Sequence, residues 1–520
     1  MIAAIPSAIL LGVEARPVSV EVHVSNGLPG FTIVGLPDAA VRESRDRVRA
    51  ALLSSSLPWP QRRTTVNLAP SGVRKAGAGL DLPIAVGVLV ASGALPPSAV
   101  AGMAFCGELG LDGSLHAVGG AMALREAVAP LHIVLPACVS GEAAMGEGGE
   151  VRAATTLAAL VDQLCGRRPW PPPLPADGAG DGRSASHAGP GGPMGHHGTA
   201  GDLADVRGQR LARRALEVAA AGGHHLLLVG PPGAGKSMLA VRLPGVLPDL
   251  DRGQAIEAAR IRSAAGLPPA GGGRLPVRPP FRAPHHGASA VSVIGGGSPR
   301  LRPGEVSLAH GGVLFLDELG EFPPAVLDAL RQPLEEGVVR VSRARGTVEY
   351  PARFLLVAAM NPCPCGQRGG PGTCRCGSAT RARYARRVSG PLLDRIDVAV
   401  RVDRPDVGEL LGHEVPEGTA VVAARVAAAR RRAEARGVAS NSELGAEALD
   451  RWAPLHGAAR RLVERRLREG SLSARGYRRV QRVALTLADL AGEDEVGPGH
   501  VGEALVLRGG RSWLDEEAGG

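Results

Sequence analysis

The sequence predicts an α/β fold: a central parallel sheet flanked by helices, with an α+β domain before it and an α-helical domain after it. Three observations lead to this class. A glycine-rich loop stands between the apolar run 226–229 and a helical pattern that starts near residue 235. A second apolar run, 313–316, ends in two acids. After residue 404, strand patterns give way to helical periodicity. Short, continuous apolar runs are typical of parallel strands that are covered on both faces.

Composition limits the classes of protein to which the chain can belong. Its 520 residues correspond to about three domains. Hydrophobic residues make up 44% of the chain but aromatic residues only 2%, so its cores must consist mainly of alanine, valine and leucine. The net charge of +9 favours a polyanionic partner. No apolar stretch is long enough for a membrane span, and seven cysteines do not make a disulfide framework in so long a chain. We therefore expect a cytoplasmic protein without membrane contact.

Residues 1–165 are predicted to form the first, α+β domain. Valine at every second position from Val18 to Val24 indicates a half-buried strand, and Asp112-Gly113 is a hairpin-turn signal. Asp38 is a candidate N-cap for the helix that follows it. The predicted strands are 18–24, 31–34, 64–68, 104–109 and 132–135, and the predicted helices are 38–53 and 82–91.

Changes in composition divide the rest of the chain into a linker, 166–200, a core with the nucleotide motifs, 201–403, and a helical lid, 404–520. The linker is rich in Gly, Pro, Ala, Ser and His and cannot build a core, and nothing would hold its histidines in place for a metal ion. The arginine run 430–432 in the lid is expected to lie on a solvated face. The predicted lid helices are 419–436, 445–452, 458–468, 475–491 and 499–507.

The loop after residue 229 has the spacing G-x-x-x-x-G-K-[ST], which is reliable when a strand precedes it and a helix follows. Its glycines let backbone N–H groups converge on phosphate oxygens, and the start of the helix adds partial positive charge. Lys236 is expected to reach the β- and γ-phosphates of ATP, and the Ser237 hydroxyl to be a ligand of Mg²⁺. The predicted nucleotide-binding residues are Gly230, Pro231, Pro232, Gly233, Ala234, Gly235, Lys236, Ser237 and Asp317.

Lysine is rare in this chain and therefore informative. It occurs only at positions 75 and 236, whereas arginine is used almost everywhere else. An ammonium group is a compact point charge on a flexible stem, and the planar fork of arginine cannot replace it in a phosphate loop. The retention of lysine at 236 favours nucleotide binding over a glycine turn that matches the motif by chance.

The two acids Asp317 and Glu318 follow a predicted buried strand, at the end where parallel sheets bind their ligands. Asp317 is expected to hold Mg²⁺, directly or through water. Glu318 is expected to polarise the attacking water as the general base. The next predicted strand, 354–360, ends in the polar amide of Asn361. These residues predict hydrolysis of ATP with Mg²⁺.

Four of the seven cysteines form two close pairs, Cys363 with Cys365 and Cys374 with Cys376. Four thiols in two pairs would suit a tetrahedral zinc site. The C-x-C spacing is tighter than the usual C-x-x-C, so reduced cysteines packed within a loop are the competing interpretation. A disulfide is disfavoured in the cytoplasm.

Three segments of the first domain resemble the N-terminal domain of the ComM/YifB family of magnesium-chelatase-like AAA+ ATPases. They are Leu-Pro-Gly-Phe-Thr-Ile-Val-Gly-Leu-Pro-Asp at 28–38, Asn-Leu-Ala-Pro-Ser-Gly-Val-Arg-Lys at 67–75, and Gly-Leu-Asp-Leu-Pro at 79–83. The resemblance implies a fold similar to domain 2 of ribosomal protein S5 and to the proteolytic domain of Lon.

The likeness to Lon raises the alternative of a protease with a Ser–Lys dyad, and the residues argue against it. The nucleophile position falls on Gly79 and the lysine position falls between Met122 and Leu124. Neither a hydroxyl nor an amine is present, so acyl transfer would have no nucleophile. The domain is expected to be a non-catalytic platform for DNA or for packing between subunits.

The resemblance continues into the core, where three blocks resemble the helix-2 insert region of the clade that contains ComM/YifB, magnesium chelatase and MCM. They are Phe-Arg-Ala-Pro-His-His at 281–286, Gly-Gly-Gly-Ser at 295–298, and Pro-Gly-Glu-Val-Ser-Leu-Ala-His at 303–310. In that clade the insert projects toward the central pore of a ring. His285, His286 and His310 could therefore touch substrate, or they could be hydrogen-bonded structural residues beside a hairpin.

The resemblance also gives roles to three residues around the γ-phosphate. Asn361 takes the sensor-1 position and would orient the water. Arg395, within the segment 389–397, matches the arginine finger, which completes the site of a neighbouring subunit. Arg475, at a helix start, matches sensor 2, which contacts the γ-phosphate of its own subunit. Because a finger acts on the next subunit, the resemblance implies a homo-hexamer.

For this family, the resemblance implies an ATP-driven DNA motor for branch migration or unwinding in recombination or transformation. Two alternatives from other classes remain open: an ATPase subunit that drives metal insertion into a porphyrin, and a protein-remodelling or regulatory ATPase. The N-terminal domain and the absence of an Asp-x-Ser-x-Ser motif argue against the first alternative. The ATPase step follows from the residues, and the DNA step follows from the resemblance alone.

Overall fold

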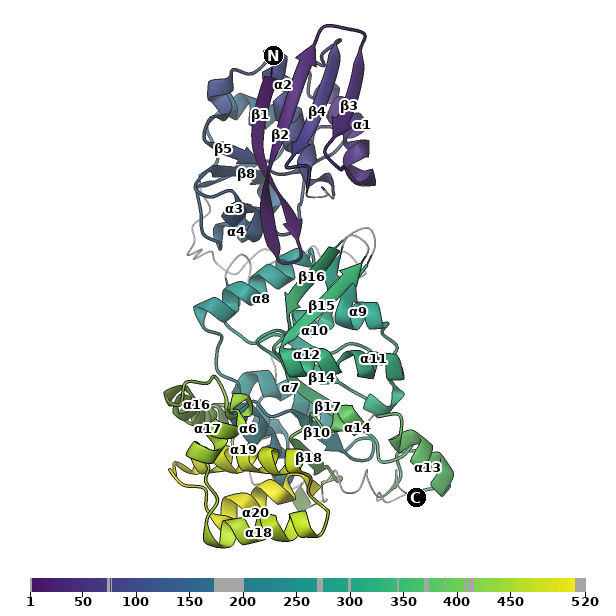
Figure 1. Ribbon diagram of the computed structural model, residues 1–520, viewed down its shortest axis with the longest axis vertical. Coiled ribbons are helices and arrows are strands. Elements are labelled where there is room, and N and C mark those ends of the chain that lie inside the picture. Colours follow the sequence, from purple (N-terminus) through teal and green to yellow (C-terminus); the bar gives the residue numbers. More distant parts are fainter. Residues whose placement is uncertain are drawn as a thin grey trace.

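The computed structural model describes residues 2–509 apart from 73, 74, 76, 173–200, 269–274, 298–300, 344, 345, 369–373, 389, 406, 407 and 410–415. The histidines of the linker, Ser389 of the finger segment and residues 510–520 lie outside the described residues. Figure 1 places the N-terminal part at the top, the central sheet in the middle and the C-terminal helices at the bottom. Within the described ranges, no helix combines the length and the apolar character that a membrane span needs.

The N-terminal part starts with a four-stranded sheet in the order β1-β2-β4-β3. Its strands are β1 (Ile2–Leu11), β2 (Glu14–Ser25), β3 (Gly30–Val34) and β4 (Arg63–Ala69). Val18, Val20, Val22 and Val24 of β2 are buried, as the alternation predicted. Helix α1 (Ala39–Ser54) has Asp38 as its N-cap, because its carboxylate accepts a hydrogen bond from Val41 N at 2.9 Å. Helix α2 (Asp81–Ala91) is buried along its whole length beside β1 and β2.

A second, parallel sheet has the order β5-β8-β9, formed by β5 (Met103–Phe105), β8 (His132–Pro136) and β9 (Val151–Ala154). The prediction of one strand over 104–109 is wrong. The chain leaves β5, and β6 (Glu108–Leu109) then forms a hairpin with β7 (Leu115–His116) around the predicted Asp112-Gly113 turn. The reason is at Gly107, whose N–H donates to Gly79 O at 2.9 Å and whose carbonyl accepts from Leu82 N at 3.0 Å. The helices of this part are α3 (Ala121–Ala127), α4 (Ala137–Ala144) and α5 (Leu157–Leu164).

A five-stranded parallel sheet in the order β11-β14-β17-β10-β18 forms the centre of the molecule. Its strands are β10 (Leu226–Val229), β11 (Phe281–Arg282), β14 (Val313–Leu316), β17 (Leu355–Met360) and β18 (Val398–Arg401). All residues of β10, β14 and β17 are buried. Because the strands are parallel, the residues that follow them (Gly230, Asp317 and Asn361) lie at one edge of the sheet. This arrangement fits a P-loop AAA+ core.

Helices and two hairpins surround this sheet. The helices are α6 (Arg210–Gly222), α7 (Lys236–Val246), α8 (Arg252–Ala264), α9 (Ala290–Ile294), α10 (Glu305–Leu308), α11 (Pro324–Ala329), α12 (Arg331–Glu336), α13 (Ser378–Ala385) and α14 (Gly390–Leu393). The hairpins are β12 (Gly295–Gly296) with β13 (Arg302–Pro303), and β15 (Val338–Arg343) with β16 (Gly346–Pro351). Short 3₁₀ helices cover Ala78–Leu80, Pro97–Val100, Leu203–Asp205, Leu319–Glu321 and Asn441–Glu443.

The C-terminal part is helical and packs directly on the central part. Its helices are α16 (Thr419–Ala435), α17 (Ala446–Trp452), α18 (Gly457–Arg468), α19 (Ala474–Ala491) and α20 (Pro498–Val506). Their buried residues share one core with α6, β10 and β18. The expectation of a solvated arginine run holds for Arg431, which is exposed, and is wrong for Arg430 and Arg432. Arg430 donates to Ala220 O at 2.7 Å through Nη2, and Arg432 Nε pairs with Asp489 Oδ1 at 3.1 Å. These arginines join helices, because each finds an acceptor on a neighbouring helix.

The N-terminal part contacts the central part at two places. At the turn between β1 and β2, Gly12 has φ +70° and lies so close to Val348 of β16 that a Cβ would come within 2.3 Å of its Cγ1. Val13 packs against the core that contains β15 and β16. Further along, Arg260 of α8 pairs with Glu126 of α3 at 2.6 Å. The division at residues 165, 200 and 403 stays a prediction, since these contacts describe packing rather than boundaries.

Candidate active site

The loop between β10 and α7 has a backbone that only glycine adopts readily. Gly233 and Gly235 have φ of +76° and +89°, and a Cβ at either position would have no atom within 4 Å. Their requirement is therefore conformational. Gly230 is required by crowding, because a Cβ there would come within 2.0 Å of Val402 O. The loop turns sharply and leaves open space beside Gly233 and Gly235, where a phosphate group would fit.

Lys236, at the start of α7, connects this loop to the end of β17. Its Nζ donates to Gly230 O at 2.6 Å, to Pro231 O at 3.0 Å and to Asn361 Oδ1 at 3.1 Å. Burial lowers the pKa of Lys236, and the charges of Asp317 and Glu318 oppose that change. The structure therefore places the amide in contact with the lysine, and the two acids are near enough for their charges to act on the lysine.

Ser237 and Asp317 face each other across the gap between α7 and β14. Ser237 Oγ donates to Asp317 Oδ2 at 2.6 Å, and Asp317 Oδ1 accepts from Glu318 N at 2.9 Å. A hydroxyl and a carboxylate side by side are the hard oxygen donors that Mg²⁺ takes beside nucleotide phosphates. The donor set and the glycine loop together fit ATP with Mg²⁺.

Glu318 adopts an unusual backbone and has a partner that sequence reasoning missed. Its φ is +53° and its ψ is +49°, a left-handed conformation that costs a residue with a side chain about 1–2 kcal/mol. Its carboxylate Oε2 lies 3.1 Å from Nδ1 of His286, which follows β11. The rings of His285 and His286 are 4.0 Å apart between centroids. His286 therefore holds the carboxylate that is the candidate general base.

His310 behaves differently from His286. Its side chain is buried, its Nε2 lies 2.9 Å from Glu257 Oε2, and its Nδ1 accepts from Arg353 N at 3.1 Å. Burial lowers the pKa of His310, although Glu257 acts in the opposite direction. Of the two interpretations of this residue, the contacts favour the structural one.

Two further residues hold the loop from outside, and the motifs did not predict them. Gln209, with φ +55°, donates through Nε2 to Ala234 O at 3.0 Å and also to Asp403 O. Arg404 donates through Nη2 to Pro232 O at 3.1 Å. The only sequence signal was their position just outside the predicted core elements, next to a helix start and after β18.

Arg395 and Arg475 are not brought to this site by the fold of one chain. Arg395 donates through Nη1 to Pro391 O at 2.6 Å and pairs with the carboxylate of Glu335. Arg475 lies on the first turn of α19, exposed, and has no polar partner within the described part of the chain. Arg479, one turn further along α19, contacts Asp397 Oδ1 at 3.3 Å. The phosphate contacts of Arg395 and Arg475 stay predictions.

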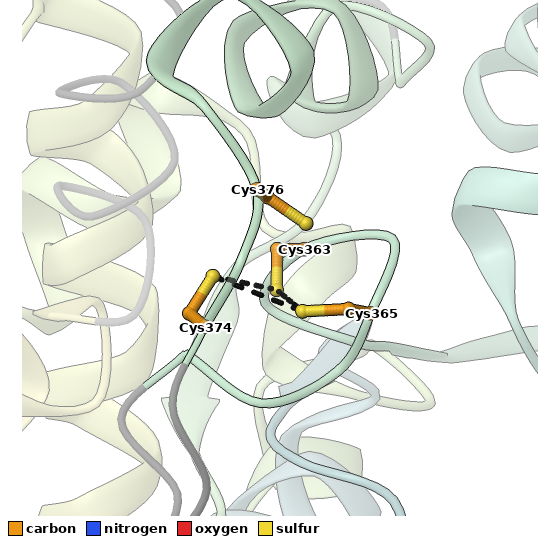
Figure 2. A group of neighbouring side chains, drawn as sticks. All are labelled: Cys363, Cys365, Cys374 and Cys376. Atoms are coloured by element: carbon orange, nitrogen blue, oxygen red, sulfur yellow. Dashed lines mark hydrogen bonds between the residues drawn. The ribbon is translucent and has the colours of Figure 1, made fainter.

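The two cysteine pairs meet in space beyond the end of β17 (Figure 2). Cys363 Sγ lies 3.4 Å from Cys365 Sγ and 3.7 Å from Cys374 Sγ, and Cys365 Sγ lies 3.8 Å from Cys374 Sγ. With Cys376 included, all four sulfur atoms lie within 4.8 Å of one another. The backbone N–H of Gln367 lowers the pKa of Cys365 to about 6, and burial raises that of Cys363 to about 11. The thiols form one group although the spacing within each pair is tight.

Comparisons with known proteins cover almost the whole chain. The family described as "Magnesium chelatase, subunit ChlI" matches residues 202–410, "Subunit ChlI of Mg-chelatase" matches 20–136, and "Magnesium chelatase, subunit ChlI C-terminal" matches 416–508. Uncharacterized protein YifB of Escherichia coli (strain K12) is 41% identical over 501 residues, which cover 96% of this chain and 95% of that protein. Competence protein ComM of Haemophilus influenzae is 40% identical over 505 residues, 96% of each chain.

A third relative, an uncharacterized protein of Mycobacterium tuberculosis, is 42% identical over 510 residues, which cover 96% of this chain and 97% of that protein. The identity thus extends over the N-terminal part, the central sheet and the C-terminal helices alike. With three matching family descriptions and relatives of nearly equal length, the chain belongs to the ComM/YifB family of magnesium-chelatase-like AAA+ ATPases.

Proposed function

We propose that this protein is an ATP-hydrolysing motor that works on DNA as a homo-hexameric ring, in branch migration or unwinding. The observation that carries the ATPase part is the convergence of Lys236, Ser237, Asp317 and Asn361 at one edge of the central sheet. Four side chains from three separate segments meet there beside a glycine loop with an open backbone. Such a group is suited to phosphoryl transfer, where catalysis is mostly positioning and charge stabilisation.

Each residue has a defined task in the proposed reaction. The N–H groups of the loop and the ammonium of Lys236 bind phosphate oxygens, and Ser237 and Asp317 would hold Mg²⁺. When bound, Mg²⁺ neutralises phosphate charge as it develops. Asn361 orients a water, and Glu318 takes its proton while the water oxygen bonds to the γ-phosphorus and the bond to the β-phosphate oxygen breaks. The products are ADP and phosphate, and release of the proton resets Glu318.

The contact between His286 and Glu318 affects the step in which Glu318 accepts the proton from water. A carboxylate that lies 3.1 Å from an imidazole nitrogen has one oxygen engaged and less freedom to accept a proton from water. We therefore expect Glu318 to act once this contact opens. His286 lies in the region that resembles the pore insert, so a ligand of the insert could open the contact.

The ring arrangement rests on Arg395. Within one chain its guanidinium pairs with Glu335 and does not contact the nucleotide loop in the described residues. A role for Arg395 in phosphate chemistry therefore requires a neighbouring subunit, as the resemblance implies. Arg475 would complete the site from the lid of the same subunit.

Two observations from outside the nucleotide site support the DNA part of the proposal. A full-length relative is named Competence protein ComM. The net charge of +9 suits a polyanionic partner. The N-terminal domain, for which we retain the prediction of an S5 domain 2-like fold, would be the platform for DNA or for neighbouring subunits. A protein that handles DNA in this way would act in the cytoplasm.

The test of the DNA part is ATPase activity of the purified full chain with and without forked and single-stranded DNA. We expect stimulation by DNA that falls as salt rises, because phosphate contacts release counterions. Filter binding at the same salt concentrations should show the same slope. If turnover at low salt were the same with and without every DNA tested, the DNA part would be abandoned while the ATPase part stood.

The ring is tested by mixing two inactive variants, Arg395→Ala and Glu318→Gln. Each variant alone should be inactive, one for lack of the finger and the other for lack of the base. In a randomly mixed ring, about a quarter of the interfaces combine an intact base with an intact finger, so activity should return to about that fraction of the wild type. No recovery on mixing, with mixed rings verified by tagged subunits, would mean that Arg395 does not act between subunits.

The second candidate is an ATPase subunit for metal insertion into a porphyrin, since all three matching family descriptions name magnesium chelatase. The same assay separates the two. If DNA left the rate of ATP turnover unchanged and chelatase partner subunits raised it, the result would favour the chelatase. A protein-remodelling ATPase would instead respond to a protein substrate. The full-length likeness to a competence protein makes DNA the first choice.

A further inference from the structure

The loop between β17 and α13 carries a group of four thiols that the ATPase chemistry does not use. Cys363 and Cys365 follow Asn361, and Cys374 and Cys376 precede α13. All seven cysteines are free, and no histidine or carboxylate joins this group of four among the described residues. Four sulfur atoms within 4.8 Å of one another, from two separated stretches of chain, are more than loop packing requires.

The spacing of the sulfurs matches that of a single tetrahedral ion. With Zn–S bonds of about 2.3 Å, the edges of a tetrahedral four-sulfur shell are about 3.8 Å long. The three separations among the Sγ atoms of Cys363, Cys365 and Cys374 are 3.4, 3.7 and 3.8 Å. A covalent disulfide needs about 2.05 Å, and an iron–sulfur cluster would need room for several metal and sulfide ions. The group has room for one ion, and an all-thiolate tetrahedron selects a soft metal such as zinc over Mg²⁺.

The backbone around the thiols is also suited to ligation. Gly366, directly after Cys365, has φ +72°, and its N–H donates to Cys363 O at 2.9 Å, which closes a tight turn. This turn joins Cys363 to Cys365, whose Sγ atoms lie 3.4 Å apart.

The thiol group is in contact with the nucleotide loop. A Cβ on Gly366 would come within 2.6 Å of Pro232 Cδ, so the turn between Cys365 and its neighbours packs directly on the loop residue Pro232. Asn361, two residues before Cys363, accepts from Lys236 at 3.1 Å. The position of Asn361 therefore depends on how the cysteine loop is held.

The other end of the group reaches the acids. Arg381 of α13 donates through Nη1 to Cys376 O at 2.7 Å. Tyr384 of the same helix is buried and lies against Gly320, where a Cβ would come within 2.6 Å of its ring carbon Cζ. Gly320 follows Asp317 and Glu318 by a few residues. The thiol group therefore lies between the nucleotide loop, which it meets at Pro232, and α13, which packs against Gly320 just after the two acids.

We infer that Cys363, Cys365, Cys374 and Cys376 bind one structural zinc ion that holds Asn361 and the loop around it against the nucleotide loop. The ion takes no part in hydrolysis. It closes the segment between β17 and α13, which contains residues too polar and too small to form a core of its own. The positioning half of this inference rests on the proposed ATP site, and the metal half does not.

The metal half is tested on the purified full chain by elemental analysis. We expect one zinc per chain, released when a mercurial reagent titrates the thiols, and the intense visible bands of tetrahedral cobalt thiolate after exchange with Co²⁺. Cys365→Ser, at an exposed position, should lose the metal, whereas the matched control Cys138→Ser, an exposed cysteine in α4, should keep it. Wild-type protein without zinc and without cobalt bands, or with iron in its place, would overturn the site.

The positioning half is tested by kinetics. Wild-type protein stripped of zinc should show a kcat lower by about 10-fold or more, with a smaller change in nucleotide affinity, and should recover when zinc is restored. This comparison does not depend on the folding of any variant. A stripped protein whose kcat stays within twofold of the zinc-loaded one would overturn the positioning role. If neither form hydrolysed ATP, the proposed function would fail while the zinc content still decided the metal site.

Discussion

The two lysines of this chain lie in surroundings that look alike at first and differ in what they can do. Lys75, in the N-terminal part, donates to Pro70 O, and Lys236 donates to Gly230 O and Pro231 O. Both side chains are buried, and burial lowers the pKa of both. The difference is in the charges nearby. Asp317 and Glu318 act on Lys236, whereas burial is the one resolved influence on Lys75 in the described residues.

The comparison shows what makes a lysine a phosphate ligand. Within the described residues, the ammonium of Lys75 donates to one backbone carbonyl, that of Pro70, while the backbone of Lys75 bonds to Leu36 and Asp38, so the residue is a structural element. At Lys236 the same carbonyl contacts occur beside an open glycine backbone, a hydroxyl and two acids that would hold a metal ion. The surroundings, not the burial of the ammonium, distinguish the two.

The largest expected effect is from Lys236→Ala. We expect nucleotide affinity to fall and ATP turnover to fall by about 10²–10³-fold, because a charged donor to the phosphates is lost in the ground state and in the transition state. Binding of a fluorescent ATP analogue and phosphate release measure the two effects. If the Lys236→Ala variant kept the ATP turnover of the wild type, the nucleotide would have to bind elsewhere, and Lys236 would not differ from Lys75 in function.

A smaller effect, confined to the chemical step, is expected from Glu318→Gln. Nucleotide affinity should stay near that of the wild type, while kcat falls by about 10²-fold or more because the amide cannot accept the proton. The matched control is Glu321→Gln, a neighbouring acid that pairs with Arg387 at 2.9 Å on the surface. If both variants slowed turnover equally, the general-base role of Glu318 would be lost.

The smallest effect on catalysis, and a distinct effect on stability, is expected from Lys75→Met. ATP turnover should stay within twofold of the wild type. Because burial holds the pKa of Lys75 in the folded chain below its ordinary value of 10.5, the unfolded chain binds the proton more tightly. The free energy of unfolding of the wild type should therefore rise as pH rises through the interval below 10.5.

The Met variant lacks this titration, so its free energy of unfolding should change less over the same pH interval. Urea unfolding followed through Trp59, which packs against the N-terminal core, measures the difference. Equal pH dependence in the two proteins would mean that burial does not lower the pKa of Lys75. The comparison between Lys75 and Lys236 would then no longer hold.

Much of the fold followed from local patterns. The strand at 226–229 was predicted with the bounds it has, Asp38 was correctly identified as an N-cap, and the lid helices begin and end within one residue of prediction. These features depend on hydrophobic periodicity and capping, which are properties of neighbouring residues. Strand β1 was missed because its burial does not alternate regularly. The break at Gly107 was missed because its cause is a hydrogen bond to the distant Gly79.

The site was predictable to the same extent. The loop, the acids and Asn361 are contiguous motifs, and each was found from its own segment. The contacts between segments could not be found in this way. Lys236 contacts Asn361 because β17 lies between β10 and β14 in the sheet, and no single sequence motif predicts this strand order. His286 reaches Glu318 for a similar reason, since β11 pairs with β14.

The hairpin of β1 and β2 has a consequence for the lengths that this chain can tolerate. Its strands pair without a break from Ile2 with His23 to Leu11 with Glu14, and each paired residue adds about 3.4 Å. Adding or removing two pairs would move Gly12 by about 7 Å along the hairpin and out of its contact with Val348, although the ion pair of Arg260 with Glu126 would still join the two parts. We therefore expect a change in the length of this hairpin to weaken the contact between the N-terminal part and the β15–β16 hairpin.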